Sequence, residues 1–139
     1  MRKRIAAACF VFCSTAVTQQ PAIAPCEVNA RSQAELSDCA GAELKRADAE
    51  LNRVYQQLLS KAGGNSAAAQ KIRVAQRAWL AFRDAHIAEL WPNAANLGSA
   101  HSMCVNQALG ELTKERLKML QHMLAAEEGD VCRPAYGGQ

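Results

Sequence analysis

The sequence has no excess of charge once its first 24 residues are set aside. The chain of 139 residues holds 16 Lys and Arg against 13 Asp and Glu, and three of the basic residues stand at positions 2–4. From position 25 onward, 13 basic residues therefore face 13 acidic ones. Nucleic-acid binding needs a basic surface that neutralises phosphates, and an anionic membrane surface attracts polybasic segments. We therefore expect no nucleic-acid partner.

The sequence also lacks an apolar run that could cross a bilayer, because the uncharged stretch at residues 5–17 is shorter than the ~20 residues required. This stretch follows the basic cluster and leads to Ala22-Ile23-Ala24, which together are typical of a secretion signal. We expect residues 1–24 to be a signal peptide, with cleavage after Ala24 or, alternatively, after Ala16. The mature chain, residues 25–139, is then one periplasmic or secreted domain.

Metal-ligand spacing is missing from the mature chain, which contains neither a Cys-x-x-Cys pair nor a short Cys/His cluster. We expect no metal and no cofactor. Pro25 precedes Cys26 where a lipoprotein signal requires a small residue, so we expect no lipid anchor. Four cysteines remain after residue 24, and an even number in a short exported chain indicates disulfides, with three possible connectivities. They are Cys26, Cys39, Cys104 and Cys132.

What the sequence does contain is helical periodicity, with no strand pattern and no repeat. A capping box, Ser32 to Glu35, opens the first predicted helix at about 32–62, and Gly63-Gly64 ends it. The second predicted helix spans about 66–91 and is stopped by Pro92. The third spans about 99–126. The second helix is expected to bury Ala69, Ile72, Ala75 or Gln76, Trp79, Phe82 and Leu90. Long helices with short connections predict an all-α, three-helix up-down-up bundle with disulfides and an extended tail, residues 127–139.

This topology favours one disulfide connectivity. Cys39 lies two turns into the first helix and Cys104 lies near the start of the third, so both are at one end of the bundle. We expect Cys39–Cys104, and by elimination Cys26–Cys132. The second pair requires the tail to run back along the bundle from its opposite end.

Catalytic constellations are not visible, and we expect no enzyme. His86, His101 and His122 have no second histidine three or four residues away. Ser99 stands near His101, but it occupies the position of a helix N-cap. The irregular connection before the third helix is the segment that we expect to touch a partner, because loops on rigid scaffolds carry recognition. Its candidate binding residues are Asn93, Asn96, Gly98, Ser99 and His101.

Polar residues on or beside the apolar faces form a second group. Their spacing suggests either a binding site or, as we favour, an interhelical network that sets the register, with Arg83 or Arg116 meeting Asp48. The group comprises Asp48, Asn52 and Tyr55 on the first helix, Gln76, Trp79, Arg83 and Asp84 on the second, and Thr113 and Arg116 on the third.

The same residues carry a family resemblance. The stretches at residues 47–55, 75–85, 98–99 and 112–116, above all Gln76-x-x-Trp79-x-x-x-Arg83-Asp84, closely resemble the lysozyme-inhibitor LprI family of bacterial envelope proteins. The likeness covers about residues 26–120. It implies a small exported helical protein that contains cysteines and inhibits lysozyme, or otherwise binds another envelope protein. Many members place a cysteine shortly after the Arg-Asp pair, where this chain has Ala85-His86-Ile87, so their disulfide maps do not transfer directly.

Overall fold

The computed structural model describes residues 25–93, 98–127 and 132, without the side chains of Pro25 and Glu27, and this part of the chain is helical with no strand. The predicted signal peptide and most of the predicted tail lie outside these residues. The elements are α1 (Pro25–Asn29), α2 (Gln33–Lys61), α3 (Ala67–Leu90), the short 3₁₀ helix η2 (Gly98–Ala100) and α4 (His101–Leu124). The all-α, up-down-up bundle is confirmed, and the three long helices agree with the expected ranges to within two residues.

Local signals set the ends of the helices. At the start of α2, Ser32 Oγ accepts from the Glu35 amide at 3.2 Å, while Glu35 Oε2 accepts from the amides of Ser32 and Arg31, so the capping box is confirmed. Gly63 and Gly64 adopt positive φ values of 78° and 56°, which ends α2 and turns the chain. Ser66 then caps α3 by accepting from the Ala69 amide.

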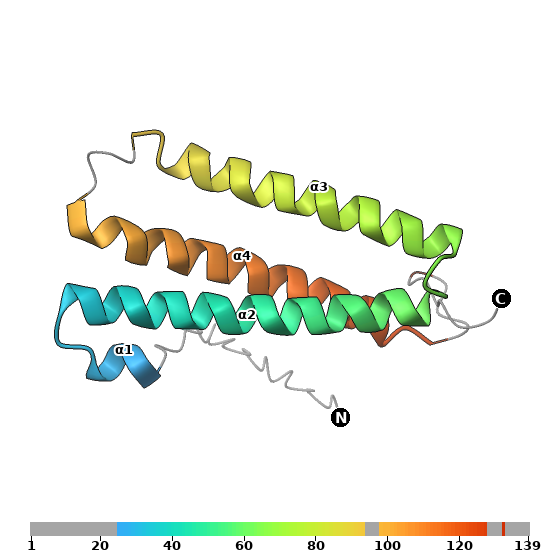
Figure 1. Cartoon of the computed structure of the whole chain (residues 1–139), viewed down its shortest axis with the longest axis horizontal. Coiled ribbons are helices and arrows are strands. Elements are labelled where there is room, and N and C mark those ends of the chain that lie inside the picture. Colours follow the sequence, from blue (N-terminus) through green and yellow to red (C-terminus); the bar gives the residue numbers. More distant parts are fainter. Residues whose placement is uncertain (1–24, 94–97, 128–131, 133–139) are drawn as a thin grey trace, which may run out of the picture.

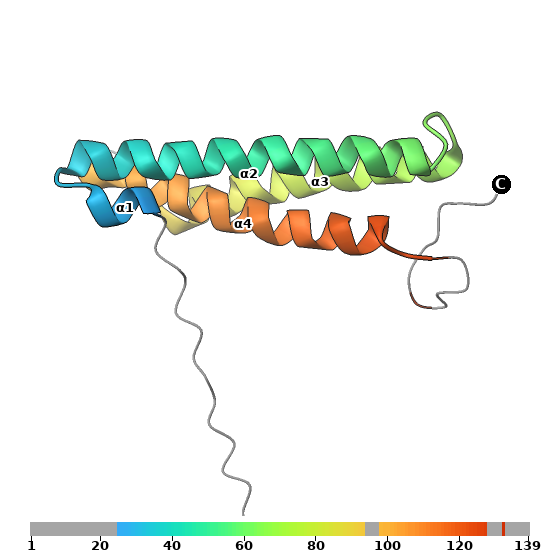
Figure 2. The ribbon, with the colours of Figure 1, turned by 90° about the horizontal axis from the view of Figure 1, so that it is seen from below.

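Helices α2 and α4 run parallel and side by side, and α3, which connects them in the chain, runs in the opposite direction (Figures 1 and 2). Three hydrogen bonds, each between residues 65 positions apart, mark the register of α2 on α4. Ser102 Oγ donates to Ser37 Oγ at one end, Thr113 Oγ1 to Asp48 Oδ1 in the middle, and Lys61 Nζ to the Ala126 carbonyl at the other end. Lys61 also reaches the Leu124 carbonyl at 2.8 Å, so it satisfies backbone acceptors where α4 ends.

The apolar core is concentrated at the end of the bundle that carries the Gly63-Gly64 turn. Leu58 and Leu120 are fully buried there, and α3 contributes Ala69 and Ile72. Further along, α3 separates from α2 and α4 (Figure 1), so that Leu90 remains 47% exposed although it lies on the expected inner face. The core therefore holds the first turns of α3 more firmly than the last.

The inner face of α3 differs from the prediction at one large residue. Phe82 is 56% exposed, and the inward-facing position at this level belongs to the neighbouring Arg83, whose side chain is half-buried. The residues that face inward, Ile72, Gln76, Trp79 and Arg83, are spaced three or four apart, and Phe82 lies about 100° away from Arg83 around the helix. The alternative of Ala75 or Gln76 is resolved in the same way, because Gln76 is buried and Ala75 is exposed.

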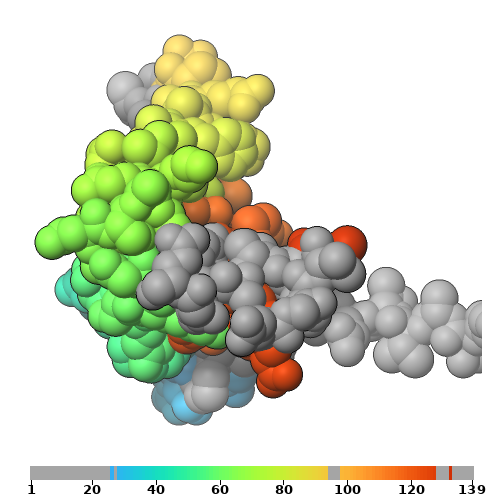
Figure 3. Space-filling model, turned by 90° about the vertical axis from the view of Figure 1, so that its right-hand side faces the viewer, coloured from blue at the N-terminus to red at the C-terminus, as the bar shows by residue number. Residues whose placement is uncertain are grey.

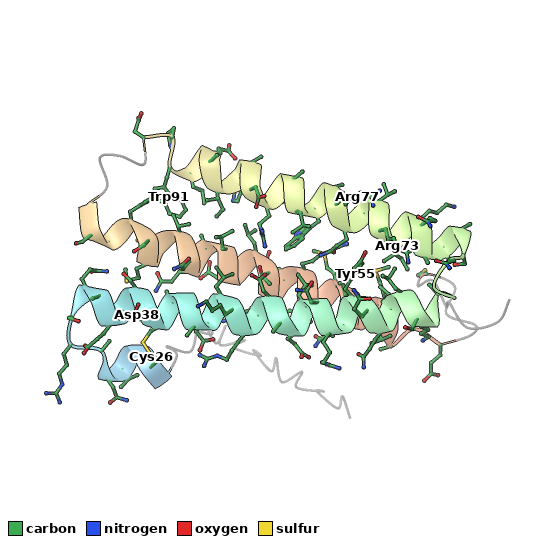
Figure 4. The ribbon with its side chains drawn as sticks, viewed as in Figure 1. Cys26, Asp38, Tyr55, Arg73, Arg77 and Trp91 are labelled. Atoms are coloured by element: carbon green, nitrogen blue, oxygen red, sulfur yellow. A yellow bond between two sulfur atoms is a disulfide. The ribbon has the colours of Figure 1, made fainter. Side chains whose placement is uncertain are left out.

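The predicted disulfides Cys39–Cys104 and Cys26–Cys132 are wrong. Cys26 and Cys39 form the disulfide, with their Cα atoms 5.7 Å apart, and Cys104 and Cys132 are free. The reason is α1, which the sequence analysis did not predict. This short helix folds back beside the beginning of α2 (Figures 1 and 4) and brings Cys26 to Cys39, so Cys39 is unavailable to Cys104 at the same level of the bundle.

Peptide mapping of the oxidised protein is expected to recover Cys26 linked to Cys39, with Cys104 and Cys132 open to alkylation. Because a disulfide removes entropy from the unfolded chain, and this one closes a loop over a sequence separation of 13, Cys26→Ser is expected to lower the free energy of unfolding by about 2–3 kcal/mol. Cys132→Ser is the matched control and is expected to leave the midpoint of denaturation unchanged. Recovery of a Cys39–Cys104 peptide would contradict the fold of α1.

The capping box also predicts a pH dependence. Hydrogen bonds from the backbone amides of Arg31 and Ser32 hold the pKa of Glu35 below its usual value of 4.5. A depressed pKa in the folded state means that the stabilisation is present above pH ~4.5 and is lost as the pH falls through the folded value. Glu35→Gln is therefore expected to be less stable than wild type at pH 7, with the difference shrinking in acid. Asp38→Asn, an exposed neighbour on α2, serves as the control, and a pH-independent difference would contradict the assignment.

Candidate functional site

Three of the predicted polar residues meet in the middle of the bundle, one from each long helix. Asp48 on α2 accepts from Thr113 Oγ1 of α4 at 3.5 Å, and its Oδ1 lies 3.6 Å from Nη1 of Arg83 on α3. Thr113 is fully buried, and the Arg83 side chain is 18% exposed. Asp48 thus forms the point at which α3 is tied to the α2–α4 pair.

Trp79 stands between two guanidinium groups at the same level. The Cζ atom of Arg83 lies 5.3 Å from the ring centroid and that of Arg116 lies 6.0 Å away, distances at which cations are attracted to an indole. Arg116 Nε also donates to Oε1 of the buried Gln76 at 3.1 Å. Burial lowers the pKa of Arg116, yet a guanidinium remains charged at any physiological pH, so Gln76 and Trp79 hold a cation between α3 and α4.

The other predicted members lie at the edge of this cluster or apart from it. Asp84 is exposed and accepts from Arg83 Nε at 3.2 Å. Tyr55 packs against the apolar core instead, and Asn52 is exposed to solvent. The central groups are paired with one another across three helices, so this arrangement ties α3 to the α2–α4 pair. We call it the polar cluster, which consists of Asp48, Gln76, Trp79, Arg83, Thr113 and Arg116.

The predicted binding loop lies at the opposite end of the bundle from the core. Asn93 and Ser99 are exposed, and Gly98 is exposed with φ of 64°, whereas Asn96 falls in the stretch 94–97 outside the described residues. His101 is half-buried against Trp91, with the ring centroids 6.0 Å apart and the rings edge to face. This contact joins the end of α3 to the start of α4 and anchors both sides of the loop.

The start of α4 differs from the prediction that Ser99 is its N-cap. Ser99 belongs to η2, and α4 begins at His101 after Ala100, whose side chain makes no capping bond. The predicted N-cap role of Ser99 is therefore wrong, because the 3₁₀ turn enters the helix directly. The exposed Ser99 hydroxyl is left on the surface of the loop.

Sequence reasoning missed a hollow of about 130 Å³ between α3 and α4. It opens where the two helices separate, beyond the polar cluster toward the loop. Glu111 and Glu115 lie four residues apart and therefore on one face of α4, and this spacing is the sequence signal that could have indicated the hollow. The lining consists of His86, Leu90, Ala108, Glu111, Leu112 and Glu115.

Within residues 25–93, 98–127 and 132, no three His, Cys, Asp or Glu side chains are grouped so that they could hold a metal ion. None of the described helices combines the length and the apolarity that a bilayer crossing requires.

The fold and the Cys26–Cys39 disulfide define a class of small, disulfide-containing three-helix proteins. The chain belongs to the LprI family, since residues 26–120 match the family model described as lysozyme inhibitor LprI. An uncharacterized protein of Rhizobium meliloti (strain 1021) is 33% identical over an alignment that covers 92% of this chain and 99% of the relative. No solved structure matches the chain.

The geometry of the polar cluster predicts the effect of removing Arg83. Arg83→Ala leaves Asp48 without its cation and Trp79 with only the guanidinium of Arg116, so we expect a loss of about 1–2 kcal/mol, or roughly 3–8 °C in Tm. Arg83→Lys is expected to recover only part of this, because an ammonium keeps the charge but not the planar stacking. Thermal unfolding followed by circular dichroism measures both.

Arg46→Ala is the matched control for this measurement. Arg46 is exposed and paired with Glu43 on its own helix, an arrangement that contributes little to stability. A Tm for Arg83→Ala that equals the control value would show that the cluster does not hold α3 in place.

Proposed function

We propose that this protein is an exported, non-enzymatic binding protein that inhibits a lysozyme-type peptidoglycan hydrolase at the bacterial cell envelope. The observation that carries the proposal is the family match, which spans residues 26–120 and therefore includes α2, α3 and most of α4. The Cys26–Cys39 disulfide supports export, because such bonds persist in oxidising compartments such as the periplasm or the cell exterior.

The loop at residues 93–101 is the surface that we assign to the enzyme. Asn93 and Ser99 present amide and hydroxyl groups to solvent, and these groups can both donate and accept hydrogen bonds. A cleft that binds sugar hydroxyls offers the complementary groups, so an inserted loop of this kind can replace a glycan. The Trp91–His101 contact supports this role by holding the two ends of the loop together, which lowers the entropic cost of ordering it.

Charge makes little contribution to this mode of binding. Residues 92–101 contain no carboxylate, and the chain from residue 25 onward has no net charge. Lysozymes are usually basic, so a strongly acidic inhibitor would be steered to them by long-range attraction that salt screens. For this protein we expect inhibition that depends on shape and hydrogen bonds and that changes little between low and physiological salt.

The proposal is tested by adding the oxidised protein, purified from the periplasm of an expressing bacterium, to several lysozyme types acting on cell-wall substrate. Dose-dependent loss of activity is expected. The triple variant Asn93→Ala, Asn96→Ala, Ser99→Ala is expected to raise the half-inhibitory concentration at least about tenfold, since each lost interfacial hydrogen bond costs ~0.5–1.5 kcal/mol.

The matched control replaces three exposed polar residues at the opposite end of the bundle, Gln56, Ser60 and Asn65, with Ala. This variant is expected to inhibit as wild type does. If no lysozyme type is inhibited, the alternative applies, in which the protein is an envelope interaction domain unrelated to lysozyme. If both triple variants inhibit equally well, inhibition uses another surface.

A further inference from the structure

The outer side of α3 is an apolar surface that nothing in the described part of the bundle covers. Val74 and Phe82 are each 56% exposed, and the alanines between and beyond them are exposed as well. At about 100° per residue these side chains fall within one sector of the helix, opposite the buried Ile72 and Gln76. We call this sector the outer strip, and it consists of Val74, Ala75, Ala78, Ala81, Phe82, Ala85 and Ala88.

In the view along the bundle, α3 stands out from α2 and α4, with its outer side away from them (Figure 3). An amphipathic helix in a small bundle normally presents charged residues on this side. Here the strip contains no charged residue over four turns, and five of its seven members are alanines, whose small side chains let another helix approach closely.

The charges that border the strip are arranged symmetrically in sequence. Lys71 and Glu89 are both exposed and stand 18 residues apart, which is five full turns, so they lie on one line at the two ends of the strip. Their midpoint is residue 80. Arg77 and Asp84, which lie along one side of the strip, are exposed too, and their midpoint falls between residues 80 and 81.

We propose that the outer strip is the contact surface between two copies of this chain, whose α3 helices pack antiparallel about residue 80. Antiparallel pairing places Lys71 of one copy opposite Glu89 of the other, and the two-fold symmetry repeats the pair. Arg77 of one copy meets Asp84 of the other in the same way, along one side of the strip. Phe82 of each copy then lies over Ala78 of the other, where the alanine leaves room for the ring.

Parallel pairing would not use these charges. It would set Lys71 against Lys71 and Glu89 against Glu89, and like charges in contact are unfavourable. The charges at the strip therefore favour a second copy of the chain as the partner, with its α3 helix antiparallel.

The size of the contact sets the expected affinity. The distance from residue 71 to residue 89 is about 27 Å at 1.5 Å per residue. Two helices packed over this length bury on the order of 1,000 Å² in total, which is the lower limit for a specific interface and typical of a weak one. The dimer is expected to form reversibly in the micromolar range. This proposal does not depend on lysozyme inhibition, because the loop at residues 93–101 is not part of the strip.

Sedimentation equilibrium of the periplasmically purified protein tests the pairing, with free thiols alkylated so that dimers linked through Cys132 are not counted. Lys71→Glu and Glu89→Lys each turn two attractions into two repulsions, so each variant alone is expected to dimerise at least about tenfold more weakly than wild type. An equimolar mixture of the two variants restores both attractive pairs and is expected to form a heterodimer with wild-type affinity. The double variant Lys71→Glu/Glu89→Lys is expected to do the same.

Recovery on mixing cannot be explained by unfolding of either variant, because a misfolded chain would not regain affinity from its partner. Lys45→Glu, an exposed charge change on α2, is the control and is expected to dimerise as wild type does. A wild-type protein that stays monomeric at about 1 mM, single variants with unchanged affinity, or a mixture that fails to recover would each overturn the proposal.

Discussion

Helices α2 and α4 lie parallel and in contact along most of their lengths, and the other features of the bundle follow from this pairing. The two backbones come close at the buried Gly110, where a Cβ atom would lie 3.9 Å from the Cα of Leu44, an ordinary van der Waals distance. Two parallel helices cannot be joined by a tight turn, so the chain must return over their whole length. Helix α3 is that return, and it packs against the α2–α4 pair.

The packing of α3 changes along its length, and each part has a different physical basis. The first turns are held by the apolar core around Leu58 and Leu120, and the middle is held by the charges and the indole of the polar cluster. Beyond Arg83 the helix separates from its neighbours, which opens the hollow at His86 and Leu90. The loop that we assign to a lysozyme therefore lies beyond the part of α3 that the core holds, whereas the outer strip lies on the side of α3 that faces away from the core.

Much of the architecture could be predicted because it rests on local signals. The Ser32–Glu35 capping box, the Gly63-Gly64 turn and the three-to-four spacing of apolar residues act over one or two turns, so they are readable without a tertiary structure. Spacing also pointed to the residues that now lie together around Asp48. Spacing did not predict that Phe82 is exposed, because an apolar residue about 100° around the helix from Arg83 is expected in the core unless the positions of the neighbouring helices are known. Nor could it find α1, which is too short for a periodic pattern.

The sequence by itself determined the helices, their order and the family, since these depend on local propensity, on apolar periodicity and on motifs that are linear in the chain. Only the tertiary structure decided the disulfide, the inner face of α3 and the hollow. Whether Cys26 reaches Cys39 depends on the direction in which residues 25–29 fold back along α2, and the composition of the chain does not determine that direction. The exposure of the outer strip likewise depends on which side of α3 meets α2 and α4, and this is settled by packing among residues far apart in the chain.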